Sequence, residues 1–152
     1  MNKIMIGAAA LLALSGTASA GPASDAVRFF YTEPMPVVHD SALNDRFADP
    51  ALTQLKNDTR IAEEGEGMGC IDFALQVSAQ DFDEAQLAKT LKLTEEVNGD
   101  DATVTATFNL FDNDPEADGT VVWSLKNVGG EWKIADIANG NGDWRLSEFD
   151  CK

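Results

Sequence analysis

The chain has 152 residues, of which 11 are Lys or Arg and 26 are Asp or Glu, so its formal net charge is −15. A surface this acidic repels the phosphate backbone of nucleic acids and the anionic surface of membranes, which argues against both as partners. Cationic proteins and small molecules remain as candidate partners, and the chain is expected to act as a monomer or a homodimer.

The first 20 residues have the pattern of a cleaved export signal. Lys3 precedes the short apolar run Ile4–Leu14, and the segment ends in Ala-Ser-Ala, the small residues that a signal peptidase requires. The apolar run is too short to span a bilayer as a helix, so we expect cleavage after Ala20 rather than a retained anchor. The sequence therefore predicts a periplasmic or secreted protein with a single domain over residues 21–152.

In the N-terminal part of this domain, apolar residues recur at helical spacing, and this pattern predicts three helices. Ser24 is placed to cap a first helix that continues through Tyr31. Ser41 is placed to open a short second helix. Asp49-Pro50 predicts the start of a third, which the glycines beginning at Gly65 end.

The sequence pattern of the C-terminal part predicts a β-sheet. Apolar and polar residues alternate over four segments, and a period of two is typical of strands with one buried face. The strands are expected over residues 90–97, 102–110, 121–125 and 132–135. Short turns between them make neighbouring strands antiparallel. We therefore expect an α+β fold in which the N-terminal helices cover a curved antiparallel sheet.

Two cysteines, Cys70 and Cys151, lie within the predicted mature chain. An even number of cysteines in an exported protein indicates a disulfide, and the sequence has no Cys-x-x-Cys pair typical of a redox site. A Cys70–Cys151 bond would tie the C-terminus to the middle of the domain.

Four short segments resemble a family of small exported bacterial proteins, the domain of unknown function 3828. They are Ala26–Tyr31, Phe47–Leu52, Ala79–Asp81 and Trp132–Ile137. The resemblance implies a nuclear-transport-factor-2-like or cystatin-like cone with a pocket between sheet and helices, and it implies no reaction. Residues 70–73 depart in part from the Asp-Pro-Phe that the family pattern leads us to expect.

Five polar side chains are candidates for ligand binding in that pocket: Tyr31, His39, Asp72, Gln80 and Asp81. Two carboxylates that face one cavity can split their pKa values and act as acid and base, which would suit Asp72 and Asp81. The alternative is that these polar side chains cap turns. His39 is either a general base or an ordinary loop residue, and Tyr31 is either a pocket or a core residue.

Two acidic loops match the spacing of calcium-binding loops only in part. In the loop that begins at Asp112, Leu125 occupies the closing position, where a bidentate acid is required. In the loop that begins at Asn139, Trp144 occupies the position where Gly makes the sharp turn. We expect surface turns in both places, with no metal site and no cofactor.

Two functions remain open at this point. The first is a non-catalytic exported binding module, for example an inhibitor or immunity protein whose acidic surface attracts a cationic partner. The second is an enzyme of the isomerase or dehydratase type that uses pocket carboxylates, which rests on fold analogy alone.

We predict that export removes residues 1–20 by cleavage after Ala20. When the full chain is produced in a bacterium with a periplasm, the intact mass of the periplasmic form should correspond to residues 21–152. An Ala18→Phe/Ala20→Phe variant should accumulate as the uncleaved precursor, because a signal peptidase requires small residues at these positions. Recovery of the wild-type chain with residues 1–20 attached would contradict the prediction.

Overall fold

The computed structural model describes residues 20–65, 67, 69–112, 114 and 118–151. The predicted export signal therefore lies outside the described residues, apart from Ala20. None of the described helices is long and apolar enough to cross a membrane.

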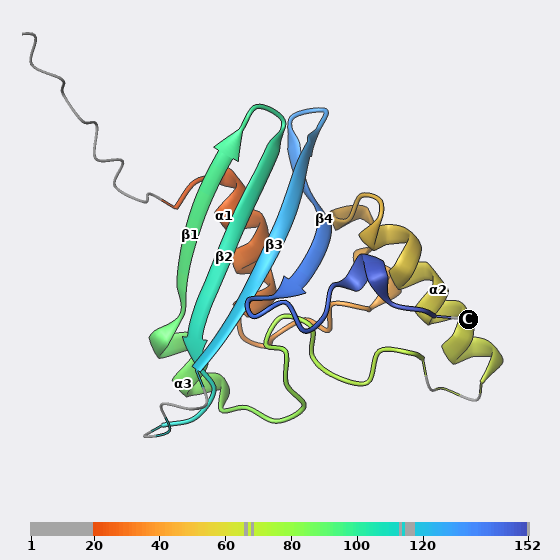
Figure 1. Ribbon diagram of the computed structural model, residues 1–152, viewed down its shortest axis with the longest axis horizontal. Helices are drawn as coiled ribbons and strands as arrows, with labels where there is room; N and C mark the ends of the chain where they lie inside the picture. The colour runs from red at the N-terminus through yellow and green to blue at the C-terminus, as the bar shows by residue number, and fades with distance from the viewer. Residues whose placement is uncertain (1–19, 66, 68, 113, 115–117, 152) are drawn as a thin grey trace, which may run out of the picture.

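The chain forms an α+β fold, as the sequence predicts, with a four-stranded antiparallel sheet in the order β1-β2-β3-β4 (Figure 1). The strands are β1 (Lys92–Asn98), β2 (Asp101–Asn109), β3 (Asp118–Val128) and β4 (Glu131–Asn139). The α-helices are α1 (Pro22–Arg28), α2 (Ala51–Glu64) and α3 (Glu84–Thr90). The described residues also form the short 3-10 helices η1 (Phe29–Tyr31), η2 (Ser41–Arg46) and η4 (Leu146–Glu148).

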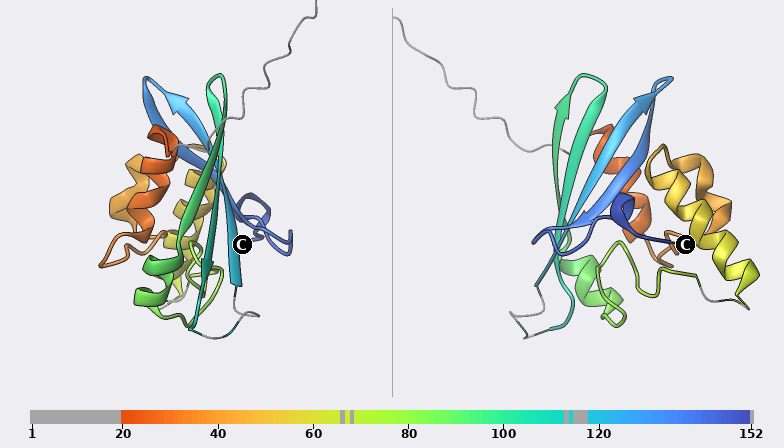
Figure 2. Two further views of the ribbon diagram at one scale, coloured as in Figure 1. Left: turned by 90° about the vertical axis from the view of Figure 1, so that its left-hand side faces the viewer. Right: turned by 45° about the vertical axis from the view of Figure 1, so that its right-hand side comes forward.

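The sheet buries one face against the helices, and the segment after β4 lies on the other side (Figure 2). In β2 the predicted alternation is confirmed, since Ala102, Val104, Ala106 and Phe108 are all buried. Such a strand presents every second side chain to the core.

A β-bulge in β4 explains why the last strand is longer than predicted and does not alternate throughout. Ser124 pairs with Asp136 while Leu125 pairs with Ile134, so Ala135 is the extra residue. The bulge shifts the alternation by one residue. The segment after β4 covers the second face, where Asp136 bonds to Ser147 and Ala138 pairs with Arg145, so five consecutive residues from Ile134 are buried.

The first helix begins at Pro22 and not after Ser24, so the predicted cap is wrong. Ser24 is fully buried, and its backbone N–H donates to Oε2 of Glu95 in β1 at 2.5 Å. A carboxylate at this end is favourable because the first amides of a helix lack partners within it. The cap therefore comes from a distant strand instead of from the local sequence.

The second and third helices occur where the sequence predicts them, although η2 is a 3-10 helix. Asp40 caps η2, because its Oδ1 accepts from the N–H of Ala42 at 2.9 Å. Asp49 accepts hydrogen bonds from the N–H and the hydroxyl of Thr53, at 3.2 and 2.7 Å. The expected role of Asp49 as an acceptor at the start of α2 is thus confirmed.

Helix α3 is absent from the predicted elements, and the strand expected from Thr90 begins at Lys92 instead. Oδ1 of Asp83 accepts from the N–H of Gln86 at 2.9 Å, and Leu87 is fully buried. An Asp followed three residues later by Gln is a signature of a helix start, so the sequence does contain a signal for α3.

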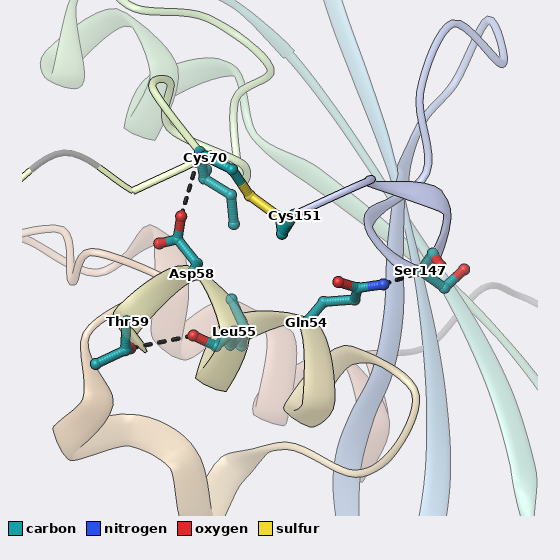
Figure 3. Close-up of a disulfide and its surroundings, with 8 residues drawn as sticks. Gln54, Leu55, Asp58, Thr59, Cys70, Ser147 and Cys151 are labelled. Atoms are coloured by element: carbon teal, nitrogen blue, oxygen red, sulfur yellow. Dashed lines mark hydrogen bonds between the residues drawn. A yellow bond between two sulfur atoms is a disulfide. The ribbon is translucent and has the colours of Figure 1, made fainter. Parts of the chain in front are cut away.

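The predicted disulfide joins Cys70 to Cys151, with 5.7 Å between the two Cα atoms (Figure 3). Helix α2 lies beside both bonded segments. Oδ1 of Asp58 accepts from the N–H of Ile71 at 2.9 Å, and Nε2 of Gln54 donates to the carbonyl of Ser147 at 3.3 Å. The C-terminus is therefore anchored covalently and through α2.

Replacement of both cysteines, Cys70→Ser/Cys151→Ser, should lower the free energy of unfolding by about 2–4 kcal/mol, because the bond closes a long loop and so restricts the unfolded chain. Urea denaturation followed by tryptophan fluorescence measures the change. Wild-type protein reduced with dithiothreitol is the matched control and should lose a similar amount. Equal stability of the oxidised wild type and the variant would contradict the prediction.

Candidate functional site

A chain of buried hydrogen bonds connects the sheet to the loops that follow η1 and α2. Nε1 of Trp123 in β3 donates to the Tyr31 hydroxyl at 3.2 Å. That hydroxyl donates in turn to the backbone carbonyl of Gln76 at 2.7 Å. The ring of Phe30 stacks on Trp123 with 5.3 Å between centroids. Gln76 is thus held in place by the most deeply buried part of the core.

The side chain of Gln76 joins two loops. It is only 3% exposed, and its Nε2 donates to the carbonyl of Pro36 at 3.0 Å. This bond fixes the orientation of the amide, because the reverse orientation would place two oxygens against each other. Oε1 of Gln76 has no hydrogen-bond partner among the described residues. A buried acceptor without a donor costs about 1–3 kcal/mol, so this oxygen is a place where a donor from outside would bind favourably.

These two loops and the start of α3 enclose a hollow of about 490 Å³, which we call the loop groove. Its lining residues are Met35–His39, Ile71–Ala74, Gln76, Gln80, Phe82 and Glu84. The volume lies within the range of small-molecule and side-chain pockets. The lining combines apolar side chains with two carboxylates, and none of the described Lys or Arg residues belongs to it. The groove therefore suits a cation with an apolar part.

Three of the five predicted site residues line the loop groove: His39, Asp72 and Gln80. Asp72 and Gln80 are exposed, and Nε2 of Gln80 donates to the backbone carbonyl of Asp72 at 3.4 Å. His39 is partly buried, and within the described part of the chain its Nδ1 has no hydrogen-bond partner. The hollow lies between loops and the start of α3, and no described strand residue lines it, so it differs from the pocket between sheet and helices that the family resemblance implies.

The other two residues lie elsewhere. Asp81 is exposed and is not part of the lining, so it does not face the same cavity as Asp72. Tyr31 is buried in the core, where its hydroxyl already has two partners. Burial raises the pKa of Tyr31 far above its usual value, and the hydrogen bond from Trp123 lowers this pKa only in part. Tyr31 is therefore a neutral residue that supports the groove.

Sequence reasoning missed Gln76, Val37 and Glu84. Gln76 had a recognisable signal, since it is a polar residue inside the otherwise apolar run Phe73–Val77. Val37 and Glu84 gave none, because their place in the groove depends on how two distant segments pack. The expected capping role near the start of the sheet belongs to Asp83.

The loop after β4 is a surface turn. Oδ1 of Asn139 and Oδ1 of Asn141 both accept from the N–H of Asp143, at 2.8 and 3.2 Å. These oxygens thus stabilise the turn itself. The described residues include no group of three or more His, Cys, Asp or Glu side chains that could hold a metal ion. The loop that begins at Asp112 lies partly outside the described residues.

Alkaline titration should produce tyrosinate only as the protein unfolds. Tyr31 is the single tyrosine, so tyrosinate absorbance reports on one group. The unfolded chain ionises near pH 10, whereas the folded protein keeps the proton. The stabilising contribution is therefore complete below about pH 10 and is lost as the pH rises further.

The measurement pairs tyrosinate absorbance with near-ultraviolet circular dichroism, and a Tyr31→Phe variant supplies the blank. Tyrosinate that forms near pH 10 while the circular dichroism stays native would contradict the prediction.

Comparison with known proteins gives one similarity of fold. No protein-family model and no curated protein matches the sequence. Among solved structures, the chain resembles a chain in the crystal structure of the type VI native effector-immunity complex Tae3-Tai3 from Ralstonia pickettii, with a TM-score of 0.54 and 21% sequence identity. The similarity covers 80% of this chain and 97% of that chain, and at this identity it shows a shared fold.

Proposed function

We propose that this chain is an exported, immunity-type inhibitor that binds and blocks a cationic protein. The observation that carries the proposal is the similarity of fold to a chain of an effector-immunity complex, in which two proteins are bound to each other. On this proposal the fold serves as a stable surface for a protein partner, which requires no cofactor and no reaction.

The charge of the chain supports a cationic partner. The formal net charge is −15, and loss of residues 1–20, with Lys3 as their one charged residue, would make it −16. The electrostatic field of a protein with a large net negative charge speeds its association with a cationic partner and disfavours binding of anionic proteins. The proposal therefore implies association that slows as the salt concentration rises.

The disulfide and the predicted signal support a place of action outside the cytoplasm. A Cys70–Cys151 bond persists in an oxidising compartment and is rare in a reducing cytoplasm. Together with the export pattern of residues 1–20, the bond supports action in the periplasm or outside the cell.

The enzymatic alternative has less support from the geometry. The enzymatic hypothesis requires the carboxylates of Asp72 and Asp81 to face one cavity. Asp72 lines the loop groove, however, whereas Asp81 lies outside it. Tyr31, a further polar candidate, already has two partners in the core. The groove thus offers a binding surface, and the Asp72–Asp81 pair on which the enzymatic alternative rested does not share it.

Two experiments test the proposal: capture of the partner protein, and protection of cells that export this partner. Immobilised residues 21–152 should retain a basic protein from extracts of the periplasm and the medium, with a slower association at high salt. Export of that captured protein into the periplasm of a bacterial host should arrest growth, and co-export of this chain should restore it.

The matched control is the same chain without residues 1–20, which stays in the cytoplasm and should not protect the cells. If no protein is retained at either salt concentration, or if the co-exported chain fails to restore growth, the proposed function is wrong.

A further inference from the structure

We propose that the loop groove receives an arginine side chain of the partner protein, whose guanidinium donates to Gln76 and to the carboxylates of Asp72 and Glu84. The identity of the partner rests on the proposed function, whereas the chemistry of the groove rests on the residues that line it. Three observations point to this occupant: a free buried acceptor, the charge of the lining and its apolar walls.

The free acceptor is Oε1 of Gln76, on a side chain that is 97% buried. Its orientation is not arbitrary, because Nε2 is engaged by the carbonyl of Pro36 and the backbone carbonyl of Gln76 is engaged by Tyr31. Because the oxygen itself is buried, the wall of the groove must shift slightly before a donor that enters the groove can reach it. A ligand that presents N–H groups would satisfy it.

The charge of the lining selects a cation. Asp72 and Glu84 contribute two exposed carboxylates from different segments, the loop after α2 and the first turn of α3. None of the described Lys and Arg residues lines the groove, so an anionic ligand would meet repulsion without compensation. A guanidinium carries five donors in a planar fork, which allows one group to serve several acceptors at once.

The apolar walls select a cation with an aliphatic stem. Val37 is 54% exposed, and Met35, Phe73 and Phe82 are partly buried beside it. An arginine side chain places its methylene groups against such a surface while its charged end reaches polar partners. A bare metal ion would gain nothing from these walls, and the described residues hold no group of three or more acidic, His or Cys side chains that could bind one.

The first experiment titrates the folded chain with N-acetyl-arginine methylamide and follows amide signals by NMR. The side-chain amide of Gln76 and the backbone amides of Asp72 and Glu84 should shift, with a Kd on the order of 1 mM for so small a probe. The citrulline analogue has the same shape without the charge and should bind at least about tenfold more weakly. Equal binding of the two probes would overturn the proposal.

Variants separate the groove from the overall charge. Asp72→Asn/Glu84→Gln should weaken binding of the arginine probe about fivefold, because each rim carboxylate contributes a modest, solvent-screened attraction. Glu96→Gln/Asp101→Asn removes the same net charge from exposed positions outside the groove lining and should change binding less than about twofold. Equal losses in both variants would show a non-specific charge effect and overturn the proposal.

The same pair of variants tests the partner once it is captured. The groove variant should lose the partner, and the control variant should keep it. Retention of the partner by the groove variant would overturn the groove proposal and leave the proposed function intact. The probe titration needs no partner, so it decides on the groove even if the proposed function fails.

Discussion

The hydroxyl of Tyr31 is the contact on which the candidate site depends. It lies between Nε1 of Trp123 in the sheet and the backbone carbonyl of Gln76 in a loop, and it satisfies both. Because all three groups are buried, each bond lost would leave a polar group without a partner. The sheet therefore fixes the position of Gln76, and Gln76 fixes Pro36 and the second wall of the loop groove.

A second constraint begins at the bulge in β4. With Ala135 as the extra residue, the carboxylate of Asp136 accepts hydrogen bonds from Arg145, from the hydroxyl and the N–H of Ser147, and from the following backbone N–H. Four donors make burial of this carboxylate tolerable. They also hold the segment that ends in Cys151, and so they place the disulfide. The C-terminal segment beside α2 is thus held both by hydrogen bonds and by the disulfide.

Local sequence patterns predicted the helices and strands that are specified by residues close together in the sequence. The alternation in β2 predicted its buried face, and Asp49 predicted the start of α2. The first helix was placed wrongly because its cap, Glu95, is 71 residues away from Ser24. Helix α3 was missed although Asp83 and Gln86 carry a helix-start signature, so that omission reflects an overlooked pattern.

The sequence by itself determined the acidic charge, the export pattern, the α+β class and the pairing of Cys70 with Cys151. These follow from composition, periodicity and a count of two cysteines. Only the tertiary structure decided that His39, Asp72 and Gln80 share a groove while Asp81 lies outside it, and that Gln76 offers a free acceptor there. The reason is physical: a hollow between two loops depends on contacts between residues distant in the chain, and local propensity does not encode them.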